Sequence, residues 1–178
     1  HVLSKNWEHG TDPESVLRIR RIYYAMVVEV DHMLGELLQA IDDRGLGEDT
    51  IVLFTSDHGE MNMEHGTFYK SSAYDSSTRV PLIVRGPGVR AGHEVTRIRS
   101  LVDIYPTVAD LAGLELPDQL DGWSLVPDLT GAATDHPDWA LSEIHDTTCD
   151  TGVFMLRAGE WKYVAYPGYA PQLFHVPS

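Results

Sequence analysis

A long amphipathic segment followed by a short, continuously apolar one constrains the fold of this chain most. Apolar residues recur at spacings of three and four over residues 19–41, which predicts one face of a long helix. Residues 11–14 supply an oxygen-bearing cap and an early proline at its start, and Gly45 ends it. The apolar run 51–55 then predicts a strand covered on both faces, as in a parallel sheet flanked by helices. Helix, turn and buried strand form the second half of a βαβ unit, so an α/β fold is expected.

Towards the C-terminus, the expected elements change from a long helix and buried strands to short strands. A second buried strand is expected at 80–84 and a short helix at 101–114, whereas the segment 117–137 is rich in proline, glycine and aspartate. Short strands are expected at 139–144, 153–157 and 161–166, the last two joined as a hairpin. We therefore predict part of a parallel-type sheet flanked by helices in residues 1–135, and the start of a small antiparallel β subdomain in residues 136–178.

The charge of the chain excludes several classes of partner. Thirteen lysines and arginines stand against 27 aspartates and glutamates, which gives a net charge of −14. A nucleic-acid binder needs a basic face, and an anionic membrane surface repels such a chain, so we expect neither partner. An anionic substrate stays open, because a metal ion and a lysine can reverse the local field. Cys149 is the single cysteine and lies in an acidic, polar loop, so we expect no internal disulfide and no reactive thiolate.

Asp57 and His58 follow the predicted strand directly and precede Gly59. In open α/β sheets, ligands bind beyond the carboxyl ends of the strands. A carboxylate there can hold a hard cation, and the adjacent imidazole can be a second ligand or a hydrogen-bond donor. Gly59 would let the backbone turn sharply, so that both side chains converge. The alternative, about equally favoured, is that Asp57 caps the next turn and that His58 lies on the surface.

Two further residues in the polar stretch after this strand could bind an anion. Lys70 could neutralise the oxygens of a sulfate or phosphate as a compact positive charge, although a solvated surface lysine is the default for such a residue. His65 could be a ligand, a substrate contact or an exposed residue, and exposure ranks first. Asp103 precedes a proline in the predicted helix and is expected to cap it rather than to take part in catalysis.

An ordered series of motifs resembles the sulfatases of the alkaline phosphatase superfamily. The series comprises Ser56-Asp57-His58-Gly59-Glu60, Phe68-Tyr69-Lys70, Arg79-Val80-Pro81-Leu82, Gly86-Pro87-Gly88, Ser100-Leu101-Val102-Asp103-Ile104-Tyr105-Pro106-Thr107 and Leu120-Asp121-Gly122-Trp123-Ser124-Leu125. The C-terminal stretch, with Leu141-Ser142-Glu143, Met155-Leu156-Arg157, Trp161-Lys162-Tyr163 and Pro171-Gln172-Leu173-Phe174, most resembles the arylsulfatase K branch and its bacterial relatives. The resemblance implies an incomplete alkaline-phosphatase-like fold, represented by its C-terminal portion.

The resemblance implies a role for each matching residue. Asp57 and His58 would be ligands of a divalent cation, usually calcium, although a histidine nitrogen matches calcium's preference for oxygen poorly, so Mg²⁺, Mn²⁺ and Zn²⁺ stay open. Lys70 would be the catalytic lysine that grips the substrate sulfate. His65 is kept as a candidate substrate contact on the residues alone, not on the resemblance. Glu143 and His145 lie where relatives line the substrate pocket.

The same resemblance implies that the nucleophile lies elsewhere. Sulfatases use a formylglycine made from cysteine or serine in a Cys/Ser-x-Pro-x-Arg motif, and this chain contains no such motif. We expect the nucleophile and further metal ligands in a missing N-terminal segment, so the chain is expected to be inactive alone. An uncovered edge of the parallel sheet would then favour self-association.

Three functions follow from these residues. The first is a sulfuric ester hydrolase that acts on a sulfated small molecule or a sulfated glycan. The second is a metal-dependent phosphodiesterase or phosphatase of the same superfamily, and the third is a non-catalytic metal-binding module. The sequence leaves the compartment open and favours a bacterial cytoplasm or periplasm over a lysosome.

Overall fold

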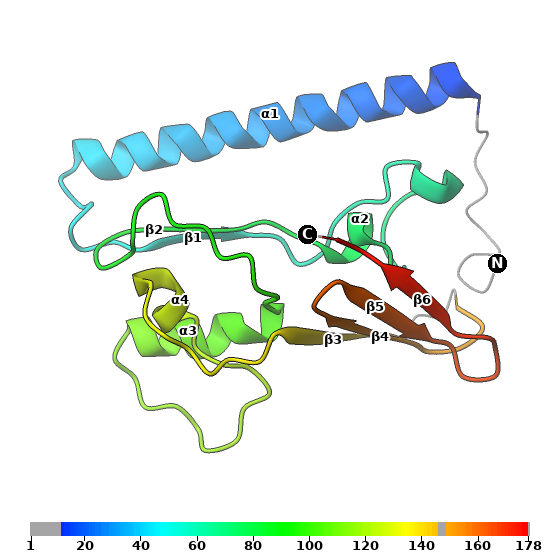
Figure 1. Ribbon diagram of the computed structural model, residues 1–178. Helices are drawn as coiled ribbons and strands as arrows, with labels where there is room; N and C mark the ends of the chain where they lie inside the picture. The colour runs from blue at the N-terminus through cyan, green and yellow to red at the C-terminus, as the bar shows by residue number, and fades with distance from the viewer. Residues whose placement is uncertain (1–11, 146–148, 178) are drawn as a thin grey trace. The chain divides into compact units, whose positions relative to one another are not determined.

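The computed structural model describes residues 12–145 and 149–177 (Figure 1). They form two compact units, each considered by itself. The first unit contains residues 12–87 and 149–150, and the second contains residues 88–145 and 151–177. The domain boundary predicted near residue 135 stays a prediction.

The first unit begins with the long helix α1, Pro13–Asp43. Asp12 caps it, because its Oδ1 accepts a hydrogen bond from the backbone N–H of Ser15 at 2.9 Å. Hydrogen bonding from the Ser15 side chain, together with this backbone contact, lowers the pKa of Asp12 below its ordinary value. Gly45 follows the helix with a φ of +67°, so the predicted helix and both of its ends are confirmed. No residue of α1 is buried in this chain, although apolar side chains surround most of its circumference.

Two short strands follow, β1 (Val52–Thr55) and β2 (Leu82–Arg85). They pair antiparallel, with Val52 opposite Arg85 and Thr55 opposite Leu82. The prediction of parallel pairing is therefore wrong for these two strands. A continuously apolar strand indicates that both of its faces are covered, but it does not indicate the direction of the neighbouring strand. The connection between the strands carries the short helices η1 (Glu64–Gly66) and α2 (Asp75–Thr78).

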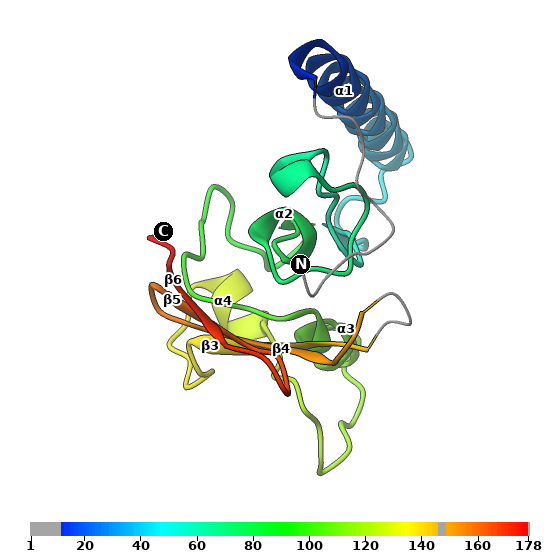
Figure 2. The ribbon, with the colours of Figure 1, turned by 90° about the vertical axis from the view of Figure 1, so that its right-hand side faces the viewer.

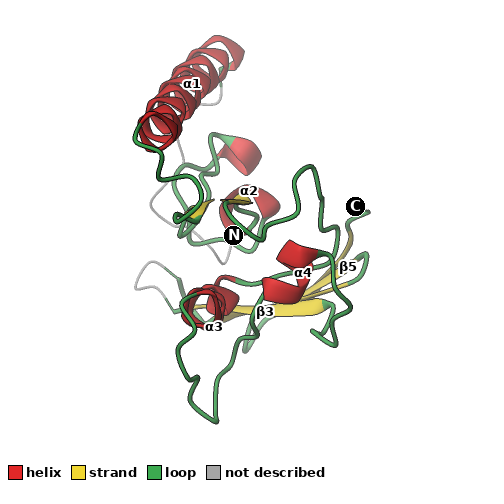
Figure 3. Cartoon of the chain, turned by 90° about the vertical axis from the view of Figure 1, so that its left-hand side faces the viewer, coloured by secondary structure: helices red, strands yellow, loops and turns green. Residues whose placement is uncertain are grey.

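The second unit contains three short helical segments followed by a meander of four strands. The helical segments are η2 (Leu101–Asp103), α3 (Ile104–Leu111) and α4 (Val126–Thr130), and the strands are β3 (Trp139–Ile144), β4 (Val153–Ala158), β5 (Trp161–Ala165) and β6 (Gln172–His175). The strands pair antiparallel in the order β3-β4-β5-β6. Figures 2 and 3 show this sheet from two opposite sides. The predicted antiparallel sheet is confirmed, and α4 and β6 are additions to the prediction.

The two faces of this sheet differ in burial. Val153, Met155 and Val164 are buried on one face, whereas Leu156 and Tyr163 are exposed on the other. This alternation is typical of an antiparallel sheet with one face in the core. Among the described residues, no helix in either unit is both long and apolar enough to cross a bilayer.

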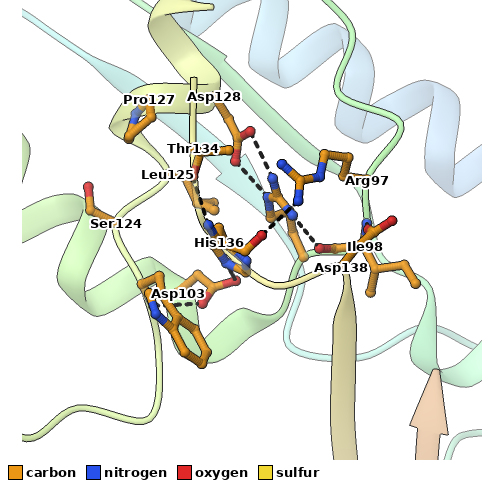
Figure 4. Close-up of polar contacts among 12 residues, drawn as sticks. Arg97, Ile98, Asp103, Ser124, Leu125, Pro127, Asp128, Thr134, His136 and Asp138 are labelled. Atoms are coloured by element: carbon orange, nitrogen blue, oxygen red, sulfur yellow. Dashed lines mark hydrogen bonds and ion pairs between the residues drawn. The ribbon is translucent and has the colours of Figure 1, made fainter. Parts of the chain in front are cut away.

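A network of buried hydrogen bonds connects the segment before β3 to the helices of the second unit (Figure 4). Asp103 closes a capping box with Ser100, accepts a hydrogen bond from the backbone N–H of Trp123 at 3.0 Å, and lies 3.0 Å from Nε2 of His136. The predicted capping role of Asp103 is thereby confirmed. Its carboxylate, which is fully buried, has hydrogen-bond partners on three separate segments.

Arg99 and Asp128 form the second part of this network. The guanidinium donates two hydrogen bonds to the carboxylate, Nε to Oδ2 at 2.6 Å and Nη2 to Oδ1 at 2.8 Å. The two side chains are only 9% and 10% exposed. Such a forked geometry ties the connection before η2 to helix α4.

Replacing Asp128 by alanine should destabilise the second unit strongly. The change leaves the Arg99 charge buried without its partner, which typically costs about 3–5 kcal/mol of unfolding free energy. Urea unfolding followed by tryptophan fluorescence measures this loss. Asp42→Ala is the matched control, because it breaks an exposed pair with Arg85 and should cost about 1 kcal/mol or less. Equal losses in the two variants would contradict the prediction.

Candidate active site

The turn after β1 brings the first two predicted site residues together. The Oγ of Ser56 donates to the carbonyl oxygen of His58 at 2.7 Å, and the backbone N–H of His58 donates to Oδ1 of Asp57 at 3.0 Å. These bonds fold the turn so that the Asp57 carboxylate remains 83% exposed at the end of the strand. Oδ2 of Asp57 lies 3.4 Å from Nε2 of His58.

Lys70, twelve residues after His58 in the sequence, is the third residue of a cluster with Asp57 and His58. Its Nζ lies 2.8 Å from Nε2 of His58, while Nδ1 of the same ring lies 2.8 Å from the carbonyl oxygen of Gly59. A carbonyl can only accept and an ammonium can only donate, so the ring donates from Nδ1 and accepts at Nε2. This assignment turns the lone pair of His58 toward the region shared by Asp57 and Lys70.

The local charges favour an ionised Asp57. Desolvation raises the pKa of its carboxyl, but the neighbouring His58 side chain, the His58 backbone N–H and the Lys70 ammonium together lower the pKa by more. The net pKa therefore lies below the ordinary value of 3.8, and the carboxylate is negatively charged at neutral pH. The ionised carboxylate and the Nε2 lone pair, which accepts a hydrogen bond from Lys70 here, are a pair of groups that can bind a metal ion.

The spacing of these two groups fits a divalent cation. Two ligands that bind one ion at about 2.1–2.4 Å lie roughly 3.0–3.5 Å apart, and Oδ2 of Asp57 and Nε2 of His58 are separated by 3.4 Å. No set of three or more His, Cys, Asp or Glu side chains converges on one point within residues 12–145 and 149–177. The cluster therefore supplies two donors, and a complete coordination shell needs additional ones.

Gly59 is required for a reason other than the predicted sharp turn. Its backbone N–H donates to the carbonyl oxygen of Ser77 at 2.8 Å, and an added Cβ would lie 2.0 Å from the carbonyl oxygen of Ser76. Its φ lies outside the left-handed region, so close backbone contact explains the glycine, not backbone direction. The contact fixes the cluster against helix α2.

The loop that carries Lys70 is strained. Five of its residues other than glycine have positive φ angles: Asn62, Met63, His65, Tyr69 and Ser71. Each such residue costs on the order of 1–3 kcal/mol and persists only where the surroundings hold it. Such strain is concentrated at functional sites, and here it flanks Lys70 on both sides.

Glu60 holds the two arms of this loop, and sequence reasoning missed it. Its Oε1 accepts hydrogen bonds from the backbone N–H groups of Asn62 at 3.1 Å and Tyr69 at 2.5 Å. Within the sequence, only its place directly after Gly59 points to it, because carboxylate-to-backbone contacts have no sequence pattern of their own.

The other predicted residues have contacts of their own. His65 is exposed and its ring stacks on Tyr74, with 3.8 Å between the ring centres. Glu143 and His145, in the second unit, form an exposed pair with 3.1 Å between Oε2 and Nε2. The ring of His145 also packs edge-on against Phe154.

Comparison with known families matches nearly the whole chain. Residues 4–114 match the family described as sulfatase, and residues 63–166 match the family described as N-sulphoglucosamine sulphohydrolase, C-terminal. Arylsulfatase K of Danio rerio is 47% identical over 182 residues, which cover 98% of this chain and 35% of the relative. The chain thus spans about a third of the length of the curated relatives it matches.

Solved structures confirm an α/β fold that is incomplete here. The phosphonate monoester hydrolase of Agrobacterium radiobacter superposes with a TM-score of 0.83 at 36% identity, covering 96% of this chain and 36% of its own. A protein solved in complex with its substrate D-glucosamine-2-N,6-O-disulfate superposes with a TM-score of 0.76 at 30% identity, covering 85% and 32%. The expected fold class is confirmed by both.

The preference for a bacterial cytoplasm or periplasm is wrong. Relatives that share 44–47% of their residues with this chain are vertebrate arylsulfatase K proteins, which give no support to a bacterial origin. Sequence composition was a poor guide here, because a chain without disulfides occurs in many compartments.

The resemblance seen in the motifs around Asp57, Lys70 and Asp103 is confirmed by the family match over 111 of 178 residues, from 4 to 114. A divalent cation is typical of this family and agrees with the spacing of Asp57 and His58. The chain belongs to the sulfatase family.

Proposed function

We propose that this chain forms the cation-binding and sulfate-binding part of a sulfuric ester hydrolase. The observation that carries the proposal is the cluster in which Lys70 Nζ lies 2.8 Å from His58 Nε2 and Asp57 Oδ2 lies 3.4 Å from the same nitrogen. A positive charge and two metal-binding groups at one strand end match the needs of a substrate anion and its counter-cation.

Each residue of the cluster has a distinct task in this proposal. Asp57 and His58 would hold the divalent cation, with Nε2 of His58 giving up its hydrogen bond from Lys70 to do so, and the bound cation would supply a fixed positive charge to the site. Lys70 donates hydrogen bonds from its ammonium to a sulfate oxygen and offsets the charge that builds there in the transition state. We infer that the cation is calcium, with the histidine ligand leaving Mg²⁺, Mn²⁺ and Zn²⁺ as the alternatives to be separated by titration.

We further propose that the nucleophile is a formylglycine outside these 178 residues. The chain contains no Cys/Ser-x-Pro-x-Arg motif, and it spans about a third of its curated relatives. His65, Glu143 and His145 are proposed as substrate contacts. The substrate class is a sulfated small molecule or glycan, and the disulfated glucosamine bound by a related structure supports the glycan.

A second candidate function is hydrolysis of a phosphonate or phosphate ester. The phosphonate monoester hydrolase of Agrobacterium radiobacter supports it at 36% identity. The 47% identity to an arylsulfatase K favours the sulfate ester. Both anions present tetrahedral oxygens to Lys70, so the cluster itself does not separate them.

Turnover by the complete protein that carries this chain separates the two functions. We expect kcat/KM for an aryl sulfate to exceed that for an aryl phosphonate or a phosphodiester, and Lys70→Met to reduce it by roughly 10²–10³-fold. Arg18→Met removes an exposed charge from α1 and should leave turnover unchanged. Faster hydrolysis of the phosphorus esters would overturn the sulfatase proposal.

The 178-residue chain by itself should release no sulfate and bind calcium weakly. Calcium prefers about six to eight oxygen ligands, and the cluster offers one carboxylate and one nitrogen. Isothermal titration with calcium and a sulfate-release assay on the purified chain check both statements. Sulfate release by this chain, or tight stoichiometric calcium binding, would contradict them.

Self-association of the isolated chain is a separate proposal. In the described parts of the chain, β1 and β2 pair only with each other, so each strand has one edge without a neighbour. Light scattering should give a mass that rises with concentration. A constant monomeric mass up to high concentration would count against this proposal.

A further inference from the structure

Glu60 lies at the base of the loop that carries Lys70. One carboxylate oxygen accepts from the backbone N–H of Asn62, on the outgoing arm, and from that of Tyr69, on the returning arm. A single group therefore fixes both arms of the loop. Tyr69 is the residue directly before Lys70, so this bond holds the backbone from which the lysine side chain extends.

Other contacts hold the loop as well, and one of them also involves Tyr69. The backbone N–H of Met61 donates to the carbonyl oxygen of Tyr69 at 2.7 Å, and that of Met63 donates to Thr67 at 2.9 Å. Near its tip, Glu64 accepts from the hydroxyl of Ser76. The Met61 bond fixes the carbonyl of Tyr69, and the Glu60 side chain fixes the N–H of the same residue, so both are needed to set the backbone before Lys70.

The positive φ angles of Tyr69 and Ser71 make the position of Lys70 sensitive to this bond. A residue with a positive φ tends to rotate to a more favourable conformation when the hydrogen bond that holds it is removed. The reason is that the left-handed region is unfavourable for residues other than glycine. Rotation at Tyr69 would swing the long Lys70 side chain away from His58.

We propose that Glu60 is the positioning residue for Lys70. It accepts the Tyr69 N–H and so sets the place of the ammonium beside Nε2 of His58. The inference rests on the proposed function for the role of Lys70, but the placement itself is measurable without turnover. Glu60 acts through the backbone, so its charge is dispensable provided that an oxygen remains at the same position.

The side-chain nitrogens of His58 report on the placement. In the 178-residue chain, two-bond ¹H–¹⁵N correlation spectra should give a protonated Nδ1 and an acceptor Nε2. Lys70→Met should shift the Nε2 resonance, because the hydrogen bond from the ammonium is lost. Glu60→Ala should move Nε2 toward the Lys70→Met position, and the double variant should show no further shift.

Conservative and control variants test whether the effect is specific. Glu60→Gln keeps an oxygen acceptor of equal reach and should retain the wild-type Nε2 resonance. Glu64→Ala removes the same charge from the same loop and should also retain it. If Glu60→Ala fails to fold, Glu60→Asp replaces it, since its oxygen is one methylene short of Tyr69 and should give the displaced resonance.

Kinetics of the complete protein provide a second readout. Glu60→Ala should lower kcat/KM for an aryl sulfate by on the order of 10²-fold, as expected for a misplaced catalytic group, and Glu60→Gln should restore most of it. In a Lys70→Met background, Glu60→Ala should add no further loss.

The outcomes distinguish the two proposals. If Lys70→Met changes Nε2 and turnover whereas Glu60→Ala and Glu60→Asp change neither, the positioning role of Glu60 is overturned and the proposed function stands. If Lys70→Met itself changes neither, the lysine has no part in the site and the proposed function fails. A loss of kcat/KM in Glu60→Gln equal to that in Glu60→Ala would also overturn the positioning role.

Discussion

The contact between the Lys70 ammonium and Nε2 of His58 is the interaction on which the candidate site depends. It brings a positive charge from a strained loop to within 2.8 Å of a ring that is fixed by the turn after β1. The bond from Nδ1 to the Gly59 carbonyl selects the tautomer, and the tautomer directs the lone pair toward Asp57 and Lys70. The His58 ring is thus held at Nδ1 by the Gly59 carbonyl and at Nε2 by Lys70. This places the ammonium next to the two metal-binding groups.

Much of this arrangement could be predicted from the sequence. The helix over 13–43 follows from its apolar spacing and its caps, and the short strands of the second unit follow from alternation. The meeting of Asp57 and Lys70 was expected from a strand end and from the ordered family motifs. Their roles as cation ligand and sulfate-binding residue stay predictions.

Other features lay outside what sequence patterns contain. The direction of β2 relative to β1 depends on the path of the intervening 26 residues, from 56 to 81, and not on the apolarity of either strand. Helix α4 has five residues and β6 has four, which is too short for a clear period. Glu60 binds backbone N–H groups, which every residue type except proline can provide, so no partner residue marked it in advance.

The close contact at Gly59 has a consequence for how the length of this segment can vary. The glycine N–H is bonded to the Ser77 carbonyl, so the loop between them is closed at its base, and Glu60 ties a second point at Tyr69. An insertion or deletion within residues 62–68 that leaves these base contacts intact would therefore keep Lys70 beside His58. The number of residues at the tip of the loop can thus vary, whereas a change in length between Tyr69 and Lys70 would separate the lysine from the histidine.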